Sequence, residues 1–182
     1  MPDSAPGPLV QLDLTASHRH LVGVRLVFTP GSATPTLRLP GWTPGSYLIR
    51  DYVRTLEGLS ASQGRSSRPC LRKGPASWRL ELASLAPVEV RYSILATELS
   101  VRTCHLNADH AFLALAGVVL QVEGERWKPH RLELRLPQSW RPFLPLPTDG
   151  EGGWRARDYD QLIDSPLEAG PHPSHAFTVA GV

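Results

Sequence analysis

Residues 39–52 read Leu-Pro-Gly-Trp-Thr-Pro-Gly-Ser-Tyr-Leu-Ile-Arg-Asp-Tyr, and this stretch is the most informative part of the chain. Two prolines and two glycines fall within six consecutive positions, and residues of these types fix a tight double turn. Trp42 and Tyr47 supply bulky side chains that can lock the turn against a neighbour, and an Arg50–Asp51 pair closes it. The pattern favours a structural corner with its aromatic rings in a core, and a binding loop is the alternative.

Two further stretches carry recognisable motifs. Residues 98–103 read Glu-Leu-Ser-Val-Arg-Thr, and residues 159–170 read Tyr-Asp-Gln-Leu-Ile-Asp-Ser-Pro-Leu-Glu-Ala-Gly. Together with residues 39–52, and in this order, they closely resemble the N-terminal domain of the glycyl aminopeptidases. Those proteins are zinc metallopeptidases that often carry a C-terminal PDZ domain. The resemblance runs from about residue 9 to residue 182.

The resemblance also implies a role. The catalytic domain of that family carries His-Glu-x-x-His, in which two imidazoles bind zinc and the glutamate acts as a base. None of the seven histidines here begins this pattern, and the sequence ends about where the catalytic domain would begin. We therefore expect a non-catalytic β-domain with no cofactor of its own, with zinc held in the missing catalytic domain. It would pack on the catalytic domain of the same polypeptide and form one wall of that domain's substrate cleft. Its effect on the peptide substrate would therefore be indirect.

A free-standing β-sandwich module that binds peptide or carbohydrate is the alternative function. Such a module needs aromatic side chains gathered on one exposed face, whereas a docking domain exposes an apolar patch without a cleft of its own. The aromatic candidates are Trp42, Trp78, Trp127, Trp140 and Trp154.

Six residues are candidates for domain docking or for a place near the substrate: Tyr47, Arg50, Asp51, Asp109, His110 and Phe112. Residues 102–112 are similar to the family's Arg-Thr-x-Tyr-Leu-x-Asp-x-His-Ala-Tyr loop, which by analogy approaches the amino-terminal side of the substrate. The family often continues Phe-Asn-Gly, whereas this chain lacks the asparagine, so a loop bonded to its own backbone is favoured over a binding role. We expect residues 47–51 and 105–112 to share one exposed face, which could also support a weak homodimer.

No metal site is expected within the chain. Pro173 separates His172 from His175, and neither this pair nor His18 and His20 has a cysteine or carboxylate at useful spacing. The acidic residues between 158 and 168 lack the order of a calcium-binding loop, so residues 164–166 are interpreted as turn chemistry with Asp164 capping the backbone.

Composition narrows the class of protein. Charged residues are 20% of the chain and the net charge is +2, which gives no indication of nucleic-acid binding. No apolar run approaches the ~20 residues that span a bilayer, so no membrane contact is expected. The two cysteines, 70 and 104, form no metal or redox motif, and reduced thiols in a cytoplasmic protein are expected. Residues 1–8 have no signal-peptide pattern and are expected to be a disordered lead-in to a single domain, 9–182.

Alternation of apolar and polar residues predicts an all-β fold, an antiparallel sandwich or saddle with little helix. The predicted strands lie at residues 10–14, 22–28, 36–40, 78–82, 88–94, 99–103, 132–136 and 177–179. Residues 111–122 are apolar on both faces and form either a central strand or two strands broken at Gly117. Residues 51–59 fit either a short helix or a strand. Residues 60–67 are predicted to form a polar hairpin loop, and residues 159–163 are predicted to form one helical turn.

Overall fold

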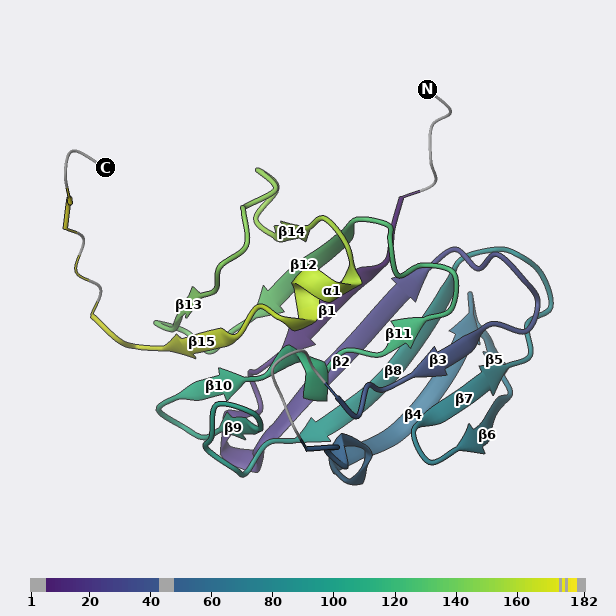
Figure 1. The fold of residues 1–182 in the computed structure, drawn as a ribbon, viewed down its shortest axis with the longest axis horizontal. Coiled ribbons are helices and arrows are strands. Elements are labelled where there is room, and N and C mark those ends of the chain that lie inside the picture. Colours follow the sequence, from purple (N-terminus) through teal and green to yellow (C-terminus); the bar gives the residue numbers. More distant parts are fainter. Residues whose placement is uncertain (1–5, 43–47, 174, 176, 180–182) are drawn as a thin grey trace.

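A computed structural model describes residues 6–42, 48–173, 175 and 177–179, and these residues form an all-β fold built from three sheets (Figure 1). The predicted fold class is therefore confirmed. Pro8, which the sequence placed in the lead-in, is buried, and its carbonyl accepts a hydrogen bond from the Arg131 N–H at 3.0 Å.

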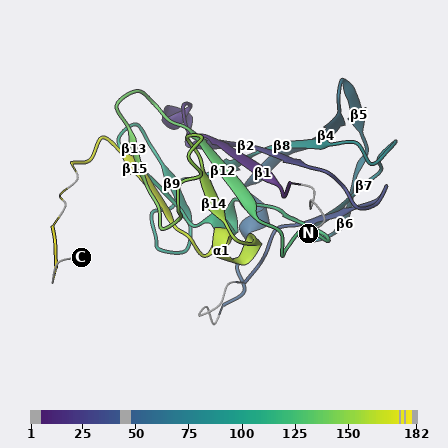
Figure 2. The ribbon, with the colours of Figure 1, turned by 90° about the horizontal axis from the view of Figure 1, so that it is seen from above.

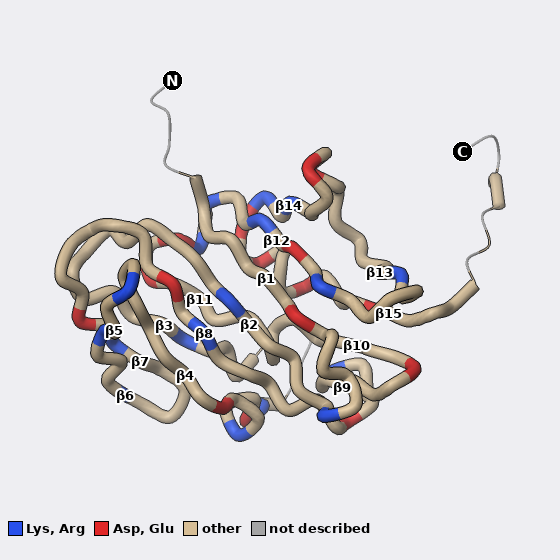
Figure 3. Tube along the Cα trace, turned by 180° about the vertical axis from the view of Figure 1, so that it is seen from behind, with Lys and Arg blue, Asp and Glu red and all other residues tan. Residues whose placement is uncertain are grey.

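The largest sheet has seven strands in the order β14-β12-β1-β2-β8-β4-β5. Their bounds are β1 Leu9–Asp13, β2 Leu21–Phe28, β4 Leu56–Gln63, β5 Ser66–Arg68, β8 Val88–Leu95, β12 His130–Arg135 and β14 Trp154–Ala156. Neighbouring strands are antiparallel except β1 and β12, which pair in parallel. Lys and Arg are interspersed with Asp and Glu across this sheet, as in the ion pairs of Glu89 with Arg25 and Arg91 (Figure 3).

Two four-stranded sheets complete the fold, in the orders β13-β15-β10-β9 and β11-β3-β7-β6. Their bounds are β3 Thr36–Arg38, β6 Cys70–Gly74, β7 Ser77–Leu80, β9 Cys104–Leu106, β10 Ala111–Leu113, β11 Gln121–Val122, β13 Arg141–Phe143 and β15 Leu167–Gly170. The sheet containing β6 and β7 lies across from the large sheet, whereas β9, β13 and β15 stand to one side (Figure 2). We call the β13-β15-β10-β9 sheet the small side sheet.

Helix within the described residues is confined to α1, Tyr159–Ile163, and three 3₁₀ turns. These turns are η1 Ser17–Arg19, η2 Tyr52–Thr55 and η3 Leu115–Gly117. The predicted helical turn at 159–163 is confirmed. Over the same part of the chain, no helix has both the length and the apolar character that crossing a membrane requires.

The alternating strands explain the core. Every second side chain of β2, from Val22 to Phe28, is buried, and β8 buries Val88, Val90, Tyr92 and Ile94 in the same way. Since successive residues of a strand point to opposite faces, this pattern directs one face of the large sheet into a single hydrophobic cluster. Each fully buried leucine or valine contributes about 1.5–3 kcal/mol.

Two predicted strands are wrong. Residues 99–103 form a loop that precedes β9, because Thr103 closes a local turn: its hydroxyl donates to the Glu98 carbonyl at 2.8 Å and its N–H donates to the Ser100 carbonyl. Residues 177–179 are not in a strand either. Residues 51–59 combine η2 with the start of β4, and most of the predicted loop at 60–67 is the β4–β5 hairpin. Residues 111–122 form two short strands with η3, which ends at Gly117, between them, as the second alternative predicted.

Two tyrosine hydroxyls hold the segment between η3 and β11. Tyr92 Oη donates to the Val118 carbonyl at 2.8 Å and accepts from the Leu120 N–H at 3.1 Å. Tyr159 Oη donates to the Val119 carbonyl at 2.7 Å. Both rings are buried, so these bonds satisfy backbone groups that water cannot reach.

Candidate functional site

A groove of about 480 Å³ brings two of the recognisable stretches together. Residues 49–52 and the rest of η2 line one side, and the start and end of the 97–104 segment line the other. In Figure 1 both segments lie along the lower edge of the large sheet, where β8 ends and β4 begins. We call this hollow the η2 groove. Arg50 and Asp51, two of the predicted residues, line it, whereas Tyr47 lies outside the described residues.

Specific contacts fix the groove walls. Arg54 Nη2 lies 2.8 Å from Glu98 Oε1, which ties η2 to the opposite segment. The Tyr52 ring packs on Gly117 so closely that a Cβ there would lie 3.0 Å from Tyr52 Cδ1. Burial raises the pKa of Tyr52, and the nearby Arg50 opposes that shift. A side chain at position 117 would therefore crowd the Tyr52 ring, which would have to shift by a few tenths of an ångström.

Four large apolar side chains are exposed beside the η2 groove. Ile49 is 88% exposed and Leu48 is 59% exposed on the η2 side, and Val101 is 81% and Leu99 63% exposed on the opposing loop. We call these four residues the apolar rim. Of the four, Ile49 also lines the η2 groove, and Leu99 and Val101 lie between Glu98 and Thr103, two residues that line its other side.

The other predicted residues lie on the small side sheet. Phe112 of β10 stands opposite His105 of β9 and Glu168 of β15, and Glu168 stands opposite Phe143 of β13. Directly opposed residues share a face, so these side chains form one row on the outer side of the sheet. The inner side is buried, as Leu106 and Ala111 show. Strand β9 connects the two regions, since Cys104 at its start lines the η2 groove.

His110 and Asp109 occupy the turn between β9 and β10. Asn107 Oδ1 accepts the backbone N–H groups of both residues, at 2.8 Å from His110 and 2.9 Å from Asp109. The loop is therefore bonded to its own chain, as the favoured prediction had it. His110 Nε2 also lies 2.6 Å from Glu168 Oε2, a partner that sequence spacing did not reveal.

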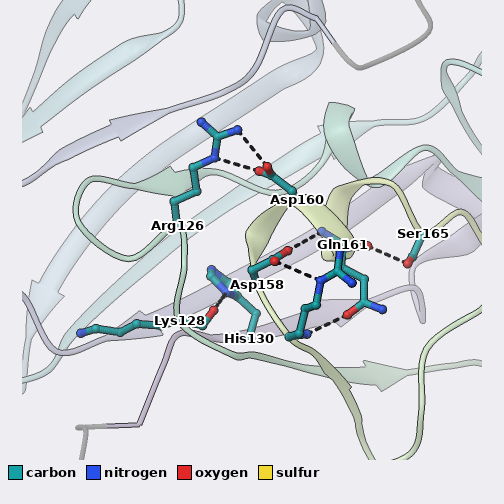
Figure 4. A network of polar contacts seen from close by, with 8 residues as sticks. Arg126, Lys128, His130, Asp158, Asp160, Gln161 and Ser165 are labelled. Carbon is teal, nitrogen blue, oxygen red and sulfur yellow. Dashed lines mark hydrogen bonds and ion pairs between the residues drawn. The ribbon is translucent and has the colours of Figure 1, made fainter.

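The motif at residues 159–170 is mainly structural. Arg126 donates two hydrogen bonds to the Asp160 carboxylate, at 2.9 and 2.8 Å, and thereby links α1 to the loop between β11 and β12 (Figure 4). The Ser165 hydroxyl donates to the Gln161 carbonyl at 2.7 Å. The side-chain cap of the helix is Asp158, whose Oδ1 accepts the Gln161 N–H at 2.8 Å.

Asp158→Ala is expected to lower the free energy of unfolding by about 1 kcal/mol at pH 7, since it removes this cap. The Gln161 N–H bond, followed by Arg157, lowers the pKa of Asp158 in the folded chain. The stabilisation is therefore complete above the unfolded pKa, near 3.9, and is lost as the pH falls through the lower folded value. Urea unfolding measured from pH 7 to pH 3 should show that the difference in the free energy of unfolding between parent and variant becomes smaller as the pH falls. Asp109→Ala, which removes a carboxylate that does not cap the helix, serves as the control.

Trp42 does not fill a core. Its side chain is 53% exposed, so the expected burial at this corner is wrong for this residue. Trp42→Ala should therefore cost less than about 1 kcal/mol in urea unfolding, within the range of surface substitutions. Trp78, which is 7% exposed, provides the matched comparison, and Trp78→Ala should cost about 3–5 kcal/mol. Equal losses for the two variants would contradict this assignment.

Comparisons with known proteins place the chain in context. Residues 9–171 match the Peptidase M61 N-terminal domain family. An aminopeptidase N family protein from Idiomarina loihiensis shares the fold over 96% of this chain, with 32% identity and a TM-score of 0.91. A mutant M1 zinc metallopeptidase from Deinococcus radiodurans, bound to a Tyr-Ser-Ala substrate, shares the fold over 91% of this chain with 10% identity and a TM-score of 0.56. The chain spans 31% of the first protein and 41% of the second. No curated protein matches the chain.

Proposed function

The chain belongs to the Peptidase M61 N-terminal domain family, and from that premise we propose that it is the non-catalytic β-domain of a glycyl-aminopeptidase-like zinc metallopeptidase. It packs on the catalytic domain of the same polypeptide and forms one wall of the substrate cleft. The reaction of the parent enzyme is attack of a zinc-activated water on the first peptide bond, with the zinc ligands outside these 182 residues.

The apolar rim beside the η2 groove is the observation that carries this proposal. Four large apolar side chains from two separate segments are exposed there. Burial of apolar surface is worth roughly 25 cal/mol per Å², so covering this rim with a second domain is favourable. The exposed Arg54–Glu98 ion pair links the two segments that carry the rim. The protein partner that fits it is an apolar face of the catalytic domain.

The experiment uses the parent polypeptide, which we propose extends beyond residue 182 into a catalytic domain. We expect that extension to contain His-Glu-x-x-His, and Ile49→Asp and Val101→Asp to weaken the coupling of the two domains. Calorimetry should then show one unfolding transition for the parent protein and two separated transitions for each variant. Leu85, which is 55% exposed beyond the start of β8 at the other end of that strand, gives the control Leu85→Asp. An extension without the zinc motif, or variants that unfold like the control, would refute the proposal.

The same rim predicts weak self-association when the catalytic domain is absent. Two copies of the 182-residue chain would cover their apolar rims against each other, with a dissociation constant well above that of a stable dimer. Sedimentation velocity over a concentration series should show a shift toward a dimer, and Val101→Asp should abolish it. A monomer at all concentrations would contradict this use of the rim.

A binding module is the second candidate, and one cavity favours it. This cavity of about 510 Å³ is lined by Trp42, Arg126 and Asp160, and the Arg126 guanidinium stacks 4.8 Å from the ring of the exposed Trp127. The other tryptophans are buried or half-buried. Titration with short peptides and oligosaccharides, followed by tryptophan fluorescence, tests this candidate. Saturable quenching that Trp42→Ala abolishes would support it, and an unchanged spectrum would exclude it for those ligands.

A further inference from the structure

Three side chains that are distant in sequence converge on the outer face of the small side sheet. His110, Glu168 and His172 each offer a ligand atom, and these atoms all lie within 4.8 Å of one another. The His110 and His172 rings are 5.4 Å apart, and His110 Nε2 is 2.6 Å from Glu168 Oε2. From this geometry we infer a binding site for a divalent transition-metal ion, with zinc as the best fit, outside any catalytic domain.

The donor set suits zinc. Two imidazole nitrogens and one carboxylate oxygen are preferred zinc ligands, and three protein ligands leave a fourth position for water. Zinc–ligand distances near 2.1 Å and tetrahedral angles place the ligand atoms about 3.4 Å apart. No two ligand atoms of the cluster lie more than 4.8 Å apart, and His110 Nε2 and Glu168 Oε2 lie 2.6 Å apart. Only small side-chain rotations are therefore needed to enclose an ion.

The sheet holds two of the ligands in place. Glu168 lies in β15 between β10 and β13, so its backbone is fixed on both sides. His110 is fixed by Asn107, which bonds to its backbone at both the N–H and the carbonyl. Metal sites built on such rigid elements lose little conformational entropy when the ion binds.

The third ligand depends on a glycine. His172 lies two residues beyond Gly170, and its ring folds back over that residue. A Cβ at position 170 would lie 2.4 Å from His172 Nε2, so any larger residue would displace the imidazole. The absence of a side chain at position 170 thus creates the space that brings His172 to Glu168.

The surroundings of the cluster fit an ion as well. All three ligand residues are half-buried, which permits entry from solvent while limiting competition by water. The His105 ring lies 5.8 Å from His110, and its buried Nδ1 has no hydrogen-bond partner among the described residues. An unsatisfied buried nitrogen is unusual, and this one belongs to a ring that neighbours the cluster.

Calorimetric titration of the untagged 182-residue chain with zinc chloride tests the inference. We expect one equivalent of zinc to bind with a dissociation constant in the micromolar range or tighter. His110→Ala and His172→Ala should each weaken binding at least tenfold, and Gly170→Ala should do the same without removing a ligand. His18→Ala changes an exposed histidine that does not belong to the cluster, and this variant should bind zinc like the parent.

Cobalt provides a second readout that does not depend on stability. Bound Co²⁺ should give the intense visible absorption of tetrahedral coordination, and zinc should displace it. Far-ultraviolet circular dichroism of each variant confirms that the chain remains folded. The inference is overturned if zinc does not bind stoichiometrically, or if the folded His172→Ala and Gly170→Ala variants bind zinc as tightly as the His18→Ala control. In either case the cluster is only a hydrogen-bonded group.

Discussion

Tyr92→Phe is expected to lower the free energy of unfolding by about 2–4 kcal/mol. The substitution keeps the buried ring and removes only the hydroxyl, which leaves the Val118 carbonyl and the Leu120 N–H without their partner. An unsatisfied buried polar group costs about 1–3 kcal/mol, and two such groups arise here. Tyr92 is buried, and this burial raises the pKa of its hydroxyl. Urea unfolding at pH 7 measures the loss.

Tyr159→Phe and Tyr52→Phe provide comparisons for the loss of stability expected from Tyr92→Phe. Tyr159 makes one such bond, to the Val119 carbonyl, so its variant should lose about half as much. Tyr52 is only half-buried, and its variant should change stability least. If all three variants lost the same amount, the hydroxyl bonds to residues 118–120 would not be what stabilises this segment.

The second large effect concerns activity. The 182-residue chain should release no p-nitroaniline from glycyl-p-nitroanilide above the buffer rate, with or without added zinc, because it has no His-Glu-x-x-His sequence. The proposed parent enzyme, which contains the catalytic domain, should hydrolyse the same substrate, and a chelator should stop it. Enzymes exceed uncatalysed rates by at least about 10⁶-fold, so the difference is all or none. Chelator-sensitive hydrolysis by the short chain would contradict a non-catalytic role.

Most of the sheet was predictable because long strands alternate. In β1, β2 and β8 every second residue is buried, and all of these buried residues are apolar, whereas the charged residues of the three strands lie at the alternate, outward positions. Short strands carry no such signal. β13 contains Pro142, and β6 is largely exposed, so neither could be distinguished from a loop.

The loop at residues 99–103 shows the limit of the pattern. Leu99, Val101 and Thr103 alternate as in a strand, yet Leu99 and Val101 are exposed and Thr103 closes a turn. The same apolar residues that suggested a buried strand instead form half of the apolar rim. Local alternation cannot distinguish burial in the chain's own core from burial against another domain.

The side-sheet cluster was beyond sequence reasoning for a different reason. His110 and Glu168 are 58 residues apart and meet only through the register of β10 with β15. In the sequence, His172 has only His175 nearby and no further ligand at useful spacing. The fold instead brings His110 and Glu168 next to His172. His110 and Phe112 were singled out as candidates, but their partners on β15 depend on strand pairing that no local pattern encodes.

Hydrogen–deuterium exchange tests the central claim most directly. Peptides covering residues 48–55 and 97–103 should exchange more slowly in the polypeptide with its catalytic domain than in the 182-residue chain, because a second domain covers the apolar rim. Peptides covering residues 81–87, at the other end of β8, should exchange at equal rates in both proteins. Equal exchange at residues 48–55 and 97–103 in the two proteins would contradict docking through the η2 groove.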